Sequence, residues 1–369
     1  MTRQHITLTV TLGLAALACS ACTARIEAET LDELLDEGVK QGLPGVILLV
    51  DRPGTDNDFL GARGSADIDA GLALTPDARF RVASNTKSFV GLALAQLEIE
   101  GVLQLDDPVA KWLGPEVLGN IENAQDVSVR QLLNHTSGIF EYLDNESFWG
   151  VVDADPQHAW TLDEALTYAH DQPAAFVPGN GWGYSNTNYL LAGKVIEAAT
   201  GQTWAEIVEA RVLGPLGLDD CFVEGHGTPT GPIVHGYSFE RGDAQDMFAV
   251  NTGYGLPDGG LVATAGDLST YVRAIATRAA PLTDAFTLAT SGLVSTGEGD
   301  SYGLGISRWP DIQGFEAWGH GGNLDGYSSE MFYFPGPDIT VVLLVNGSDG
   351  DVEAVFEAVQ ERAIELALE

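Results

Sequence analysis

Positive charge is scarce in this sequence. Lys and Arg together number 17 against 53 Asp and Glu, and the formal net charge is −36 over 369 residues. So acidic a chain repels nucleic acid and anionic lipid surfaces, and no basic cluster offsets that repulsion. Nucleic-acid binding is therefore excluded, and a small-molecule or peptide substrate is expected instead.

Cysteine is also rare, and only Cys221 of the three cysteines lies in the body of the chain. A single cysteine cannot form an internal disulfide, and it is more often a buried apolar side chain than a nucleophile. The histidines show no metal-ligand spacing, since the closest pair, His226 and His235, has no HExxH or similar frame. We expect neither a metal nor another cofactor.

The apolar run at the N-terminus is too short to span a bilayer. It covers residues 6–18, follows a short positive region, and ends in Ala-Leu-Ala, a small-x-small pattern of signal-peptide cleavage. Residues 1–22 therefore predict an export signal. Cys19 and Cys22, just after that pattern, resemble the cysteine of a bacterial lipoprotein leader. The mature protein is expected to be periplasmic or extracellular, either lipid-anchored or simply secreted.

Strand patterns lie toward both ends of the body, and helix patterns lie between them. Buried or alternating apolar runs of strand length occur at 46–50, 59–64, 302–306, 331–334 and 340–345. Helix starts dominate from 104 to 260, among them a segment at 106–113 and a capping box at 128–131. Further helices are expected near 30–41 and from 351 onward.

This order predicts an α/β (α+β) fold. One antiparallel sheet is expected from both ends of the chain, flanked by N- and C-terminal helices, with an inserted helical lobe. A single domain over 25–369 would comprise a sheet lobe (25–82 plus 265–369) and a helical lobe (84–260).

A Ser-x-x-Lys pair opens the most apolar predicted helix. Ser84 and Lys87 stand at i and i+3, and the residues from Phe89 to Ile99 are almost wholly apolar until Gly101 ends the run. A helix that is apolar on every side is buried, and its N-terminus favours developing negative charge. Ser84 is thus a candidate nucleophile. Taken alone, the pair fits an N-cap serine and a solvated lysine equally well.

The second candidate cluster is the Gly-rich loop 178–189. Tyr184 and Asn186 flank one residue there and point the same way if the loop is extended. A neighbouring ammonium is expected to lower the pKa of the Tyr184 phenol, and a phenolate can accept a serine proton. Asn186 can hold a substrate carbonyl or a lysine head. The alternative is a loop tyrosine packed on the core, with Asn188 capping the next helix.

The third cluster is His320-Gly321-Gly322-Asn323, on or leaving a strand. Glycines allow a substrate to lie close to the backbone, and an N–H group here could join that of Ser84 in holding an oxyanion. Few side chains accompany His320 in the sequence, which favours a role in a site over that of a satisfied structural histidine.

Together the three clusters resemble a known superfamily. Ser84-Asn85-Thr86-Lys87, Tyr184-Ser185-Asn186 and His320-Gly321-Gly322 match, in order and spacing, the three elements of the serine β-lactamase and penicillin-binding superfamily. The chain looks most like the branch of class C β-lactamases, D-alanyl-D-alanine carboxypeptidases and related esterases. Stretches 101–108, 132–138 and 259–268 also resemble that branch, so the likeness extends from about residue 40 to 346.

The resemblance implies a role for each matching residue. Ser84 would be the nucleophile, Lys87 its proton acceptor or electrostatic partner, and Tyr184 a general base and leaving-group acid. Which of Lys87 and Tyr184 takes the first proton stays open. His135 is expected to be a structural turn residue. Substrate binding would fall to Asn186, His320, Gly321, Gly322 and Asn323, and the oxyanion donors would be the N–H groups of Ser84 and Asn323.

One position departs from the superfamily pattern. Its third element usually has Thr or Ser in the middle, to hold a substrate carboxylate, and here that position is Gly321. His320, largely neutral at pH 7, precedes it where many relatives have lysine. The resemblance implies an exported serine hydrolase forming an acyl-enzyme on Ser84, similar to D-alanyl-D-alanine carboxypeptidases and β-lactamases. The alternatives are a carboxylesterase of the same fold or a non-catalytic penicillin-binding surface protein.

Overall fold

The computed structural model describes residues 26–55, 58–226, 229–240 and 242–369. The predicted export signal over 1–22, with Cys19 and Cys22, lies outside the described residues. Among the helices within these ranges, none has the length and apolar character needed to cross a membrane.

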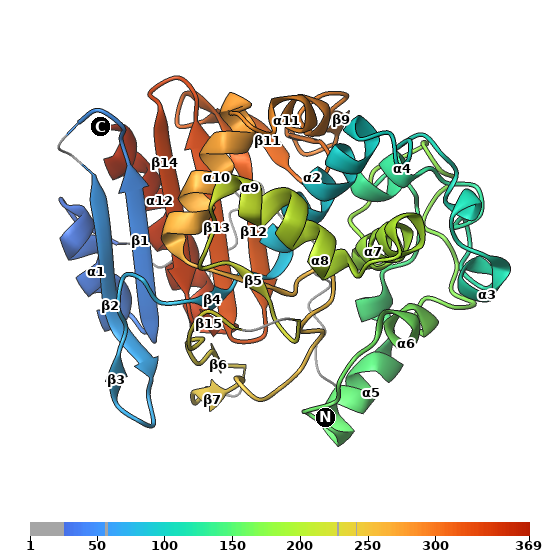
Figure 1. Ribbon diagram of the computed structural model, residues 1–369. Coiled ribbons are helices and arrows are strands. Elements are labelled where there is room, and N and C mark those ends of the chain that lie inside the picture. The colour runs from blue at the N-terminus through green and yellow to red at the C-terminus, as the bar shows by residue number, and fades with distance from the viewer. Residues whose placement is uncertain (1–25, 56–57, 227–228, 241) are drawn as a thin grey trace.

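A large antiparallel sheet is built from both ends of the chain (Figure 1). Over the described residues it has nine strands in the order β3-β2-β1-β14-β13-β12-β11-β10-β9. The N-terminal part supplies β1 (Gly45–Asp51), β2 (Phe59–Asp67) and β3 (Leu72–Ala73). The C-terminal part supplies β9 (Val294–Ser295), β10 (Ser301–Tyr302), β11 (Ser307–Ile312), β12 (Phe315–Leu324), β13 (Tyr327–Phe334) and β14 (Ile339–Val345).

The two parts of the sheet meet where β1 pairs with β14, in a register that sets Val46 opposite Val345. Strands β1 and β14 are continuous apolar runs because both of their faces are covered. Alternate side chains of each strand therefore enter different core clusters, as Val46 and Ile47 do. The predicted fold class is confirmed.

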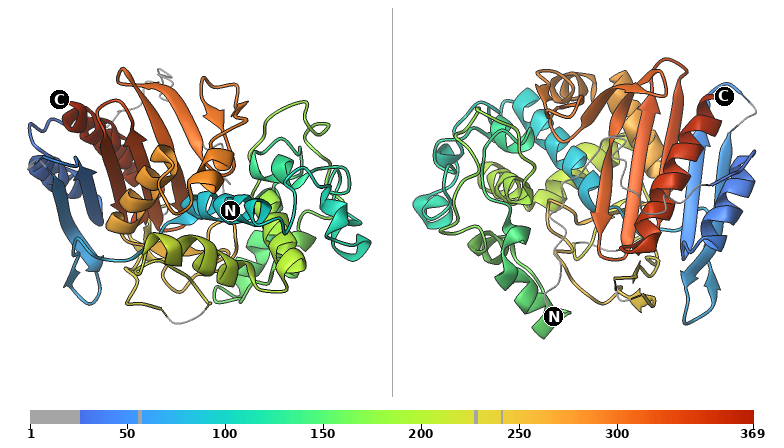
Figure 2. Two further views of the ribbon diagram at one scale, coloured as in Figure 1. Left: turned by 45° about the horizontal axis from the view of Figure 1, so that its top comes forward. Right: turned by 180° about the vertical axis from the view of Figure 1, so that it is seen from behind.

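Helices cover both faces of this sheet, as the two views of Figure 2 show. α1 (Leu31–Lys40) and α12 (Asp351–Leu368) pack together on one face, where apolar side chains of α12 such as Val355 and Val359 enter the core. α10 (Ala265–Thr277) lies on the other face, against β13 and β14. Thr30 is the N-cap of α1, since its side-chain oxygen accepts the Glu33 N–H at 3.2 Å.

The middle of the chain is mainly helical and lies beside the sheet (Figure 1). The boundaries predicted for the two lobes stay a prediction. The helices here and just beyond are α3 (Pro115–Leu118), α4 (Val129–Leu133), α5 (Glu146–Ala154), α6 (Leu162–Thr167), α7 (Asn186–Thr200), α8 (Trp204–Val208), α9 (Gly214–Leu216) and α11 (Thr283–Ala289). Two small sheets contain β4 (Phe80–Arg81), β8 (Leu261–Ala263) and β5 (Phe222–Val223), and β15 (Gly347–Ser348), β6 (Tyr237–Ser238) and β7 (Gln245–Asp246).

The helix predicted over 106–113 is wrong. Only a 3₁₀ turn, η2 (Val109–Lys111), forms there, because the backbone of this segment bonds to a distant one. The Val109 N–H donates to the Val127 carbonyl at 2.9 Å, and the Arg130 N–H donates to the Leu105 carbonyl at 2.8 Å. The capping box predicted at Ser128 is present and opens α4.

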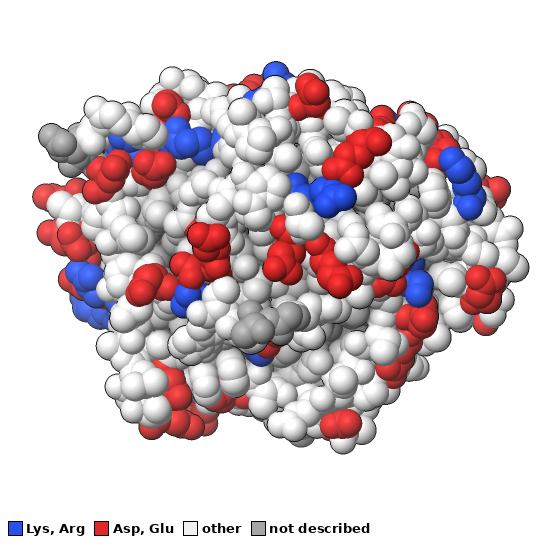
Figure 3. All heavy atoms as spheres, in the orientation of Figure 1, with Lys and Arg blue, Asp and Glu red and all other residues white. Residues whose placement is uncertain are grey.

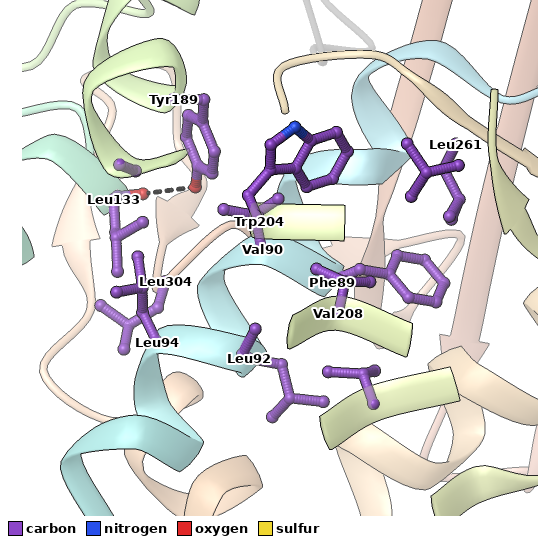
Figure 4. Packing of buried hydrophobic residues seen from close by; sticks show 14 of the residues in the cluster. Phe89, Val90, Leu92, Leu94, Leu133, Tyr189, Trp204, Val208, Leu261 and Leu304 are labelled. Atoms are coloured by element: carbon purple, nitrogen blue, oxygen red, sulfur yellow. Dashed lines mark hydrogen bonds between the residues drawn. The ribbon is translucent and has the colours of Figure 1, made fainter. Parts of the chain in front are cut away.

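α2 (Thr86–Ile99) runs between the sheet and the inserted helices, and 11 of its 14 residues are buried. Figure 4 shows side chains of α2 packed with Trp204 and Val208 of α8 and with Leu304 from the segment between β10 and β11. Gly91 is required where α2 meets the Leu304 carbonyl, because a Cβ would overlap that oxygen. The prediction of a helix buried on every side is confirmed.

Candidate active site

Ser84 lies on a tight turn that two side-chain hydrogen bonds hold in place. The turn is the 3₁₀ segment η1 (Ala83–Asn85) in front of α2, and Ala83 adopts a left-handed conformation with φ of 48°. Thr86 Oγ1 donates to the Ala83 carbonyl at 2.7 Å, and Asn85 Nδ2 donates to Ser329 Oγ on β13 at 2.8 Å. A strained residue fixed in this way is typical of functional sites.

Lys87 is fully buried directly behind Ser84. Its Nζ donates to Ser84 Oγ at 2.9 Å, to Asn186 Oδ1 at 2.6 Å and to the Asp258 carbonyl oxygen at 2.6 Å. These contacts use all three hydrogens of an ammonium. Burial lowers the pKa of Lys87 to about 8, although the carboxylates of Asp258 and Glu141 oppose that shift.

Tyr184 is near Ser84, but its predicted acidity is wrong. Burial raises the pKa of the Tyr184 phenol well above its usual value, Tyr302 raises this pKa further, and the nearby Ser84 hydroxyl lowers it only in part. Lys87 Nζ lies over the ring face, 4.9 Å from the ring centre, and does not offset this burial. Within the described residues, the buried phenol oxygen has no hydrogen-bond partner.

Asn186 is the first residue of α7, one residue after Ser185 at the N-cap. Its side-chain oxygen accepts from Lys87, which is one of the two roles that the sequence left open. Its backbone N–H donates to Glu141 Oε2. Asn188 does not cap this helix, because it is the third residue of α7 and its Oδ1 accepts from Ser137 Oγ at 2.6 Å.

His320 is buried on β12 with both ring nitrogens engaged. Nδ1 lies 2.5 Å from the Gly321 carbonyl and Nε2 lies 2.7 Å from the Tyr302 hydroxyl, so Nδ1 carries the proton and Nε2 accepts. Burial and the nearby Lys87 charge lower the pKa of His320 to about 3. The expectation of few neighbouring side chains is wrong, since Tyr302 comes from another strand, but the expected neutral charge at pH 7 agrees with this pKa.

Gly321 and Gly322 allow neighbouring groups to lie close to the backbone of β12, one on each face of the strand. A Cβ at Gly322 would overlap the Val82 carbonyl oxygen and lie 3.1 Å from the Ser84 nitrogen. A Cβ at Gly321 would overlap the carboxylate of Glu330 on β13. The pairing of β11 with β12 ends at Ser307 opposite Gly319, so among the described strands none pairs with the β11 side of residues 320–324. Asn323 is exposed on this edge.

His135 is structural, as expected. Its φ is 60° and its buried Nδ1 accepts the Ser185 N–H at 3.2 Å, which positions the loop that carries Tyr184. Three residues of the site had no individual signal in the sequence: Glu141, Asp258 and Tyr302. Each is placed by contacts with distant segments, although Asp258 directly precedes the Gly259-Gly260 stretch.

Within the described ranges, no three His, Cys, Asp or Glu side chains are grouped so that they could hold a metal ion. The arrangement around Ser84 offers a hydroxyl, a buried amine and a phenol close together. Nucleophilic attack by Ser84, with proton transfer to a neighbouring base, is chemistry that such a set can perform.

The chain is similar in sequence to several known hydrolases and penicillin-binding proteins. Esterase EstB of Burkholderia gladioli is 37% identical over 202 residues, which are 53% of this chain and 51% of that protein. Penicillin-binding protein 4* of Bacillus subtilis is 29% identical over 201 residues, 54% of this chain and 42% of that protein. The match thus spans about half the length of these curated relatives.

A solved structure, that of a D-stereospecific amidohydrolase from Streptomyces sp., superposes with a TM-score of 0.77 at 33% identity and covers 89% of this chain and 97% of that one. The family described as Beta-lactamase matches residues 31–365. The superfamily of serine hydrolases indicated by the sequence is therefore confirmed, and this chain belongs to the Beta-lactamase family.

Proposed function

We propose that the protein is a serine hydrolase that forms an acyl-enzyme on Ser84. The observation that carries the proposal is the 2.9 Å contact between Lys87 Nζ and Ser84 Oγ in a buried site. With a pKa of about 8 for Lys87, roughly one molecule in ten has the free amine at pH 7. Tyr184 keeps its proton at that pH because its pKa is raised, so Lys87 is the better first base.

In the proposed acylation, the Ser84 proton passes to Lys87 Nζ as Oγ attacks the substrate carbonyl carbon. The backbone N–H groups of Ser84 and Asn323 stabilise the resulting oxyanion. The bond to the leaving oxygen or nitrogen then breaks, and that atom takes the Tyr184 proton while Tyr184 regains one from the Lys87 ammonium. Water attacks the acyl group in the second step, and the same groups move its protons to free Ser84.

The substrate that we propose is a neutral ester or amide. His320 cannot supply a positive charge at neutral pH, because its pKa is about 3 and Tyr302 engages its Nε2. Gly321 has no hydroxyl, and the Glu330 carboxylate occupies the space that a Thr or Ser there would need. A substrate carboxylate therefore lacks the partners expected from the resemblance. The esterase and the amidohydrolase among the relatives support this substrate class.

A D-alanyl-D-alanine carboxypeptidase or β-lactamase is the second candidate, supported by the penicillin-binding relative. A non-catalytic penicillin-binding protein is less well supported, because Ser84, Lys87 and Asn186 remain connected by hydrogen bonds.

The test combines a short-chain nitrophenyl ester, an N-acetylated amino-acid nitroanilide and a fluorescent penicillin, each with wild type, Ser84→Ala and Ser291→Ala. Ser291 is exposed, and among the described residues its hydroxyl bonds only to the nearby Leu288 carbonyl, so its variant is the matched control. We expect wild type and Ser291→Ala to hydrolyse the ester or the anilide, and Ser84→Ala to be inactive. Covalent penicillin labelling without turnover of either neutral substrate would favour the second candidate, and neither activity would favour the non-catalytic alternative.

We also propose that the protein is exported to the periplasm or beyond, possessing a lipid anchor if Cys19 or Cys22 is acylated. The leader pattern over 1–22 supports the proposal. Fractionation of expressing bacteria after labelled-palmitate feeding tests it, with Cys19→Ser and Cys22→Ser as variants. Unlabelled protein retained in the cytoplasm would contradict export, and unlabelled protein in the exported fraction would indicate simple secretion.

A further inference from the structure

Two carboxylates, Glu141 and Asp258, accompany Lys87 in this site. Glu141 immediately precedes the 3₁₀ turn η3 (Tyr142–Asp144), and Asp258 lies in the loop before β8. The Asp258 side chain is buried and that of Glu141 is partly buried, and among the described residues neither forms an ion pair with an arginine. Burial raises the pKa of Glu141 to about 7 and also raises the pKa of Asp258, and in both groups the charge of Lys87 acts against this rise and favours the carboxylate.

Glu141 connects two elements of the site. Its Oε1 accepts the Leu143 N–H at 3.0 Å, and its Oε2 accepts the Asn186 N–H. One carboxylate thus fixes the start of η3 and the start of α7, where negative charge is favourable. Asn186 in turn accepts from Lys87, so displacement of Glu141 would disturb the lysine head.

The backbone of Asp258 bonds directly to Lys87, and the charge of its side chain also acts on the lysine. Its carbonyl oxygen accepts from Nζ at 2.6 Å, and its Oδ2 accepts from the Tyr142 hydroxyl at 3.0 Å. Its Oδ1 is buried and, in the described part of the chain, has no hydrogen-bond partner. A buried carboxylate oxygen without a donor is costly unless a nearby positive charge compensates it.

We propose that Glu141 and Asp258 are positioning residues that hold Lys87 against Ser84 and stabilise the ammonium that forms when Lys87 takes the Ser84 proton. This inference rests on the proposed function, because it assigns the pair a part in that same step. A lysine buried without counter-charge would resist protonation and would make a weak proton acceptor. The two carboxylates supply that counter-charge while leaving the lysine hydrogens directed at neutral oxygens.

The other ionisable groups around Lys87 do not supply negative charge near neutral pH. The rings of Tyr184 and Tyr189 lie 4.9 and 5.6 Å from Nζ, and burial raises the pKa of both phenols. Burial lowers the pKa of both the His135 and the His320 imidazole, and the nearby Lys87 charge lowers it further, so both rings are neutral. Removal of one carboxylate should therefore lower the pKa of Lys87.

Lysine titration tests the pair without relying on catalysis. The chain has only four lysines, so ¹³Cε-labelled lysine gives few signals, and loss of one signal in Lys87→Met assigns it. Glu141→Gln keeps an acceptor for the Asn186 N–H and removes the charge. We expect the Lys87 midpoint, about 8 in wild type, to fall by roughly one unit or more in Glu141→Gln and in Asp258→Asn.

Glu197→Gln is the matched control. It removes one partly buried carboxylate from the same helix α7, three turns away from Asn186, and should leave the Lys87 midpoint unchanged. An unchanged midpoint in both folded variants, Glu141→Gln and Asp258→Asn, would overturn the proposal. Circular dichroism establishes folding, and Asp258→Asn decides if Glu141→Gln does not fold.

Kinetics with a neutral nitrophenyl ester supply the second readout. In Glu141→Gln we expect the acidic limb of kcat/KM to move to lower pH with the Lys87 midpoint, and kcat to fall about tenfold with little change in KM. A purely structural role would lower activity without moving the limb, and that result would also overturn the proposal. Absence of turnover and of Ser84 acylation in wild type would contradict the proposed function alone, because the lysine titration remains measurable.

Discussion

At the residue scale, the surroundings of Lys87 and Tyr184 give these two candidate bases different protonation states. Lys87 has a pKa near the working range because burial works against two carboxylates, whereas burial keeps the Tyr184 phenol protonated. An amine that accepts a proton and a phenol that donates one suit the two halves of acyl transfer.

Tyr184→Phe tests the phenol. Loss of the proton donor should lower kcat for a neutral ester by about a hundredfold or more. The phenol oxygen has no hydrogen-bond partner in the described structure, so the melting temperature should stay unchanged or rise. Stopped assays and thermal unfolding measure both quantities, and wild-type rates in this variant would remove Tyr184 from the mechanism.

The residues that the sequence could identify are those with a local pattern. Ser84 and Lys87 share a helix face three residues apart, and the structure joins them directly. Tyr302, Glu141 and Asp258 reach the site through tertiary contacts, which no local spacing encodes. The sign of the Tyr184 pKa shift was also beyond the sequence, since it depends on how deeply the phenol is buried.

At the element scale, the contact between η1 and β12 sets the nucleophile against the open strand edge. Gly322 allows it, because any side chain would collide with the Val82 carbonyl. Asn85 and Ser329 add a side-chain bond between the turn and β13. The turn therefore has little freedom to shift.

Gly322→Ala tests this contact. The added methyl should displace Ser84, lowering kcat/KM about a hundredfold or more and destabilising the fold by about 1–3 kcal/mol. Gly266→Ala in α10 is the control, because a Cβ there meets its nearest atom at an ordinary 3.7 Å. Ester kinetics and denaturant unfolding measure the effects, and a fully active Gly322→Ala would disprove the close contact.

Glu330 makes β13 sensitive to pH. Burial raises the pKa of this carboxyl to about 8, so from its ordinary value of 4.5 up to that pKa the folded state binds more protons than the unfolded state. Stability should therefore fall as pH rises through this window. Glu330→Gln should increase the unfolding free energy by up to a few kcal/mol above about pH 8 and by little near pH 5.

Urea unfolding at both pH values measures this difference. Asp311→Asn, an exposed carboxylate in β11, is the control and should show no such pH dependence. Equal effects of Glu330→Gln at the two pH values would show that Glu330 does not stay protonated in the folded protein.

Most helices and strands could be predicted from the apolar periodicity of the sequence, and the wrong prediction at 106–113 has a physical cause. The strands β1 and β14 and the helix α2 are continuous apolar runs whose burial the sequence alone indicates. The segment 106–113 carries helix-start residues, yet its backbone pairs with residues 127–130. Long-range backbone pairing of this kind overrides local propensity.

At the scale of the whole molecule, acidic charge is spread over the surface, with basic side chains among it, on the face that Figure 3 shows. The net charge of −36 repels anions at long range, and the described residues of the candidate site add no free cation to attract an anion. Surface charge and site chemistry thus both support the proposed neutral substrates. The sheet built from both chain ends was predictable, whereas the convergence of its β12 edge with α2 needed the coordinates.

Varying the salt concentration separates the contribution of surface charge to substrate preference from the contribution of the site. With a neutral ester, kcat/KM should change little between low and high salt, whereas for an ester bearing a carboxylate it should rise several-fold as the repulsion is screened. The neutral ester should remain the better substrate at high salt, because the site itself lacks a partner for the carboxylate. Preference for the anionic ester at any salt concentration would contradict this account.

The most direct measurement is mass spectrometry of the peptide containing Ser84 after acid quenching of a reaction with a neutral nitrophenyl ester. The account predicts that this peptide gains the mass of the acyl group in wild type. It also predicts that Ser84→Ala shows neither the adduct nor turnover. Turnover that persists in Ser84→Ala, or an acyl group on another residue, would contradict it.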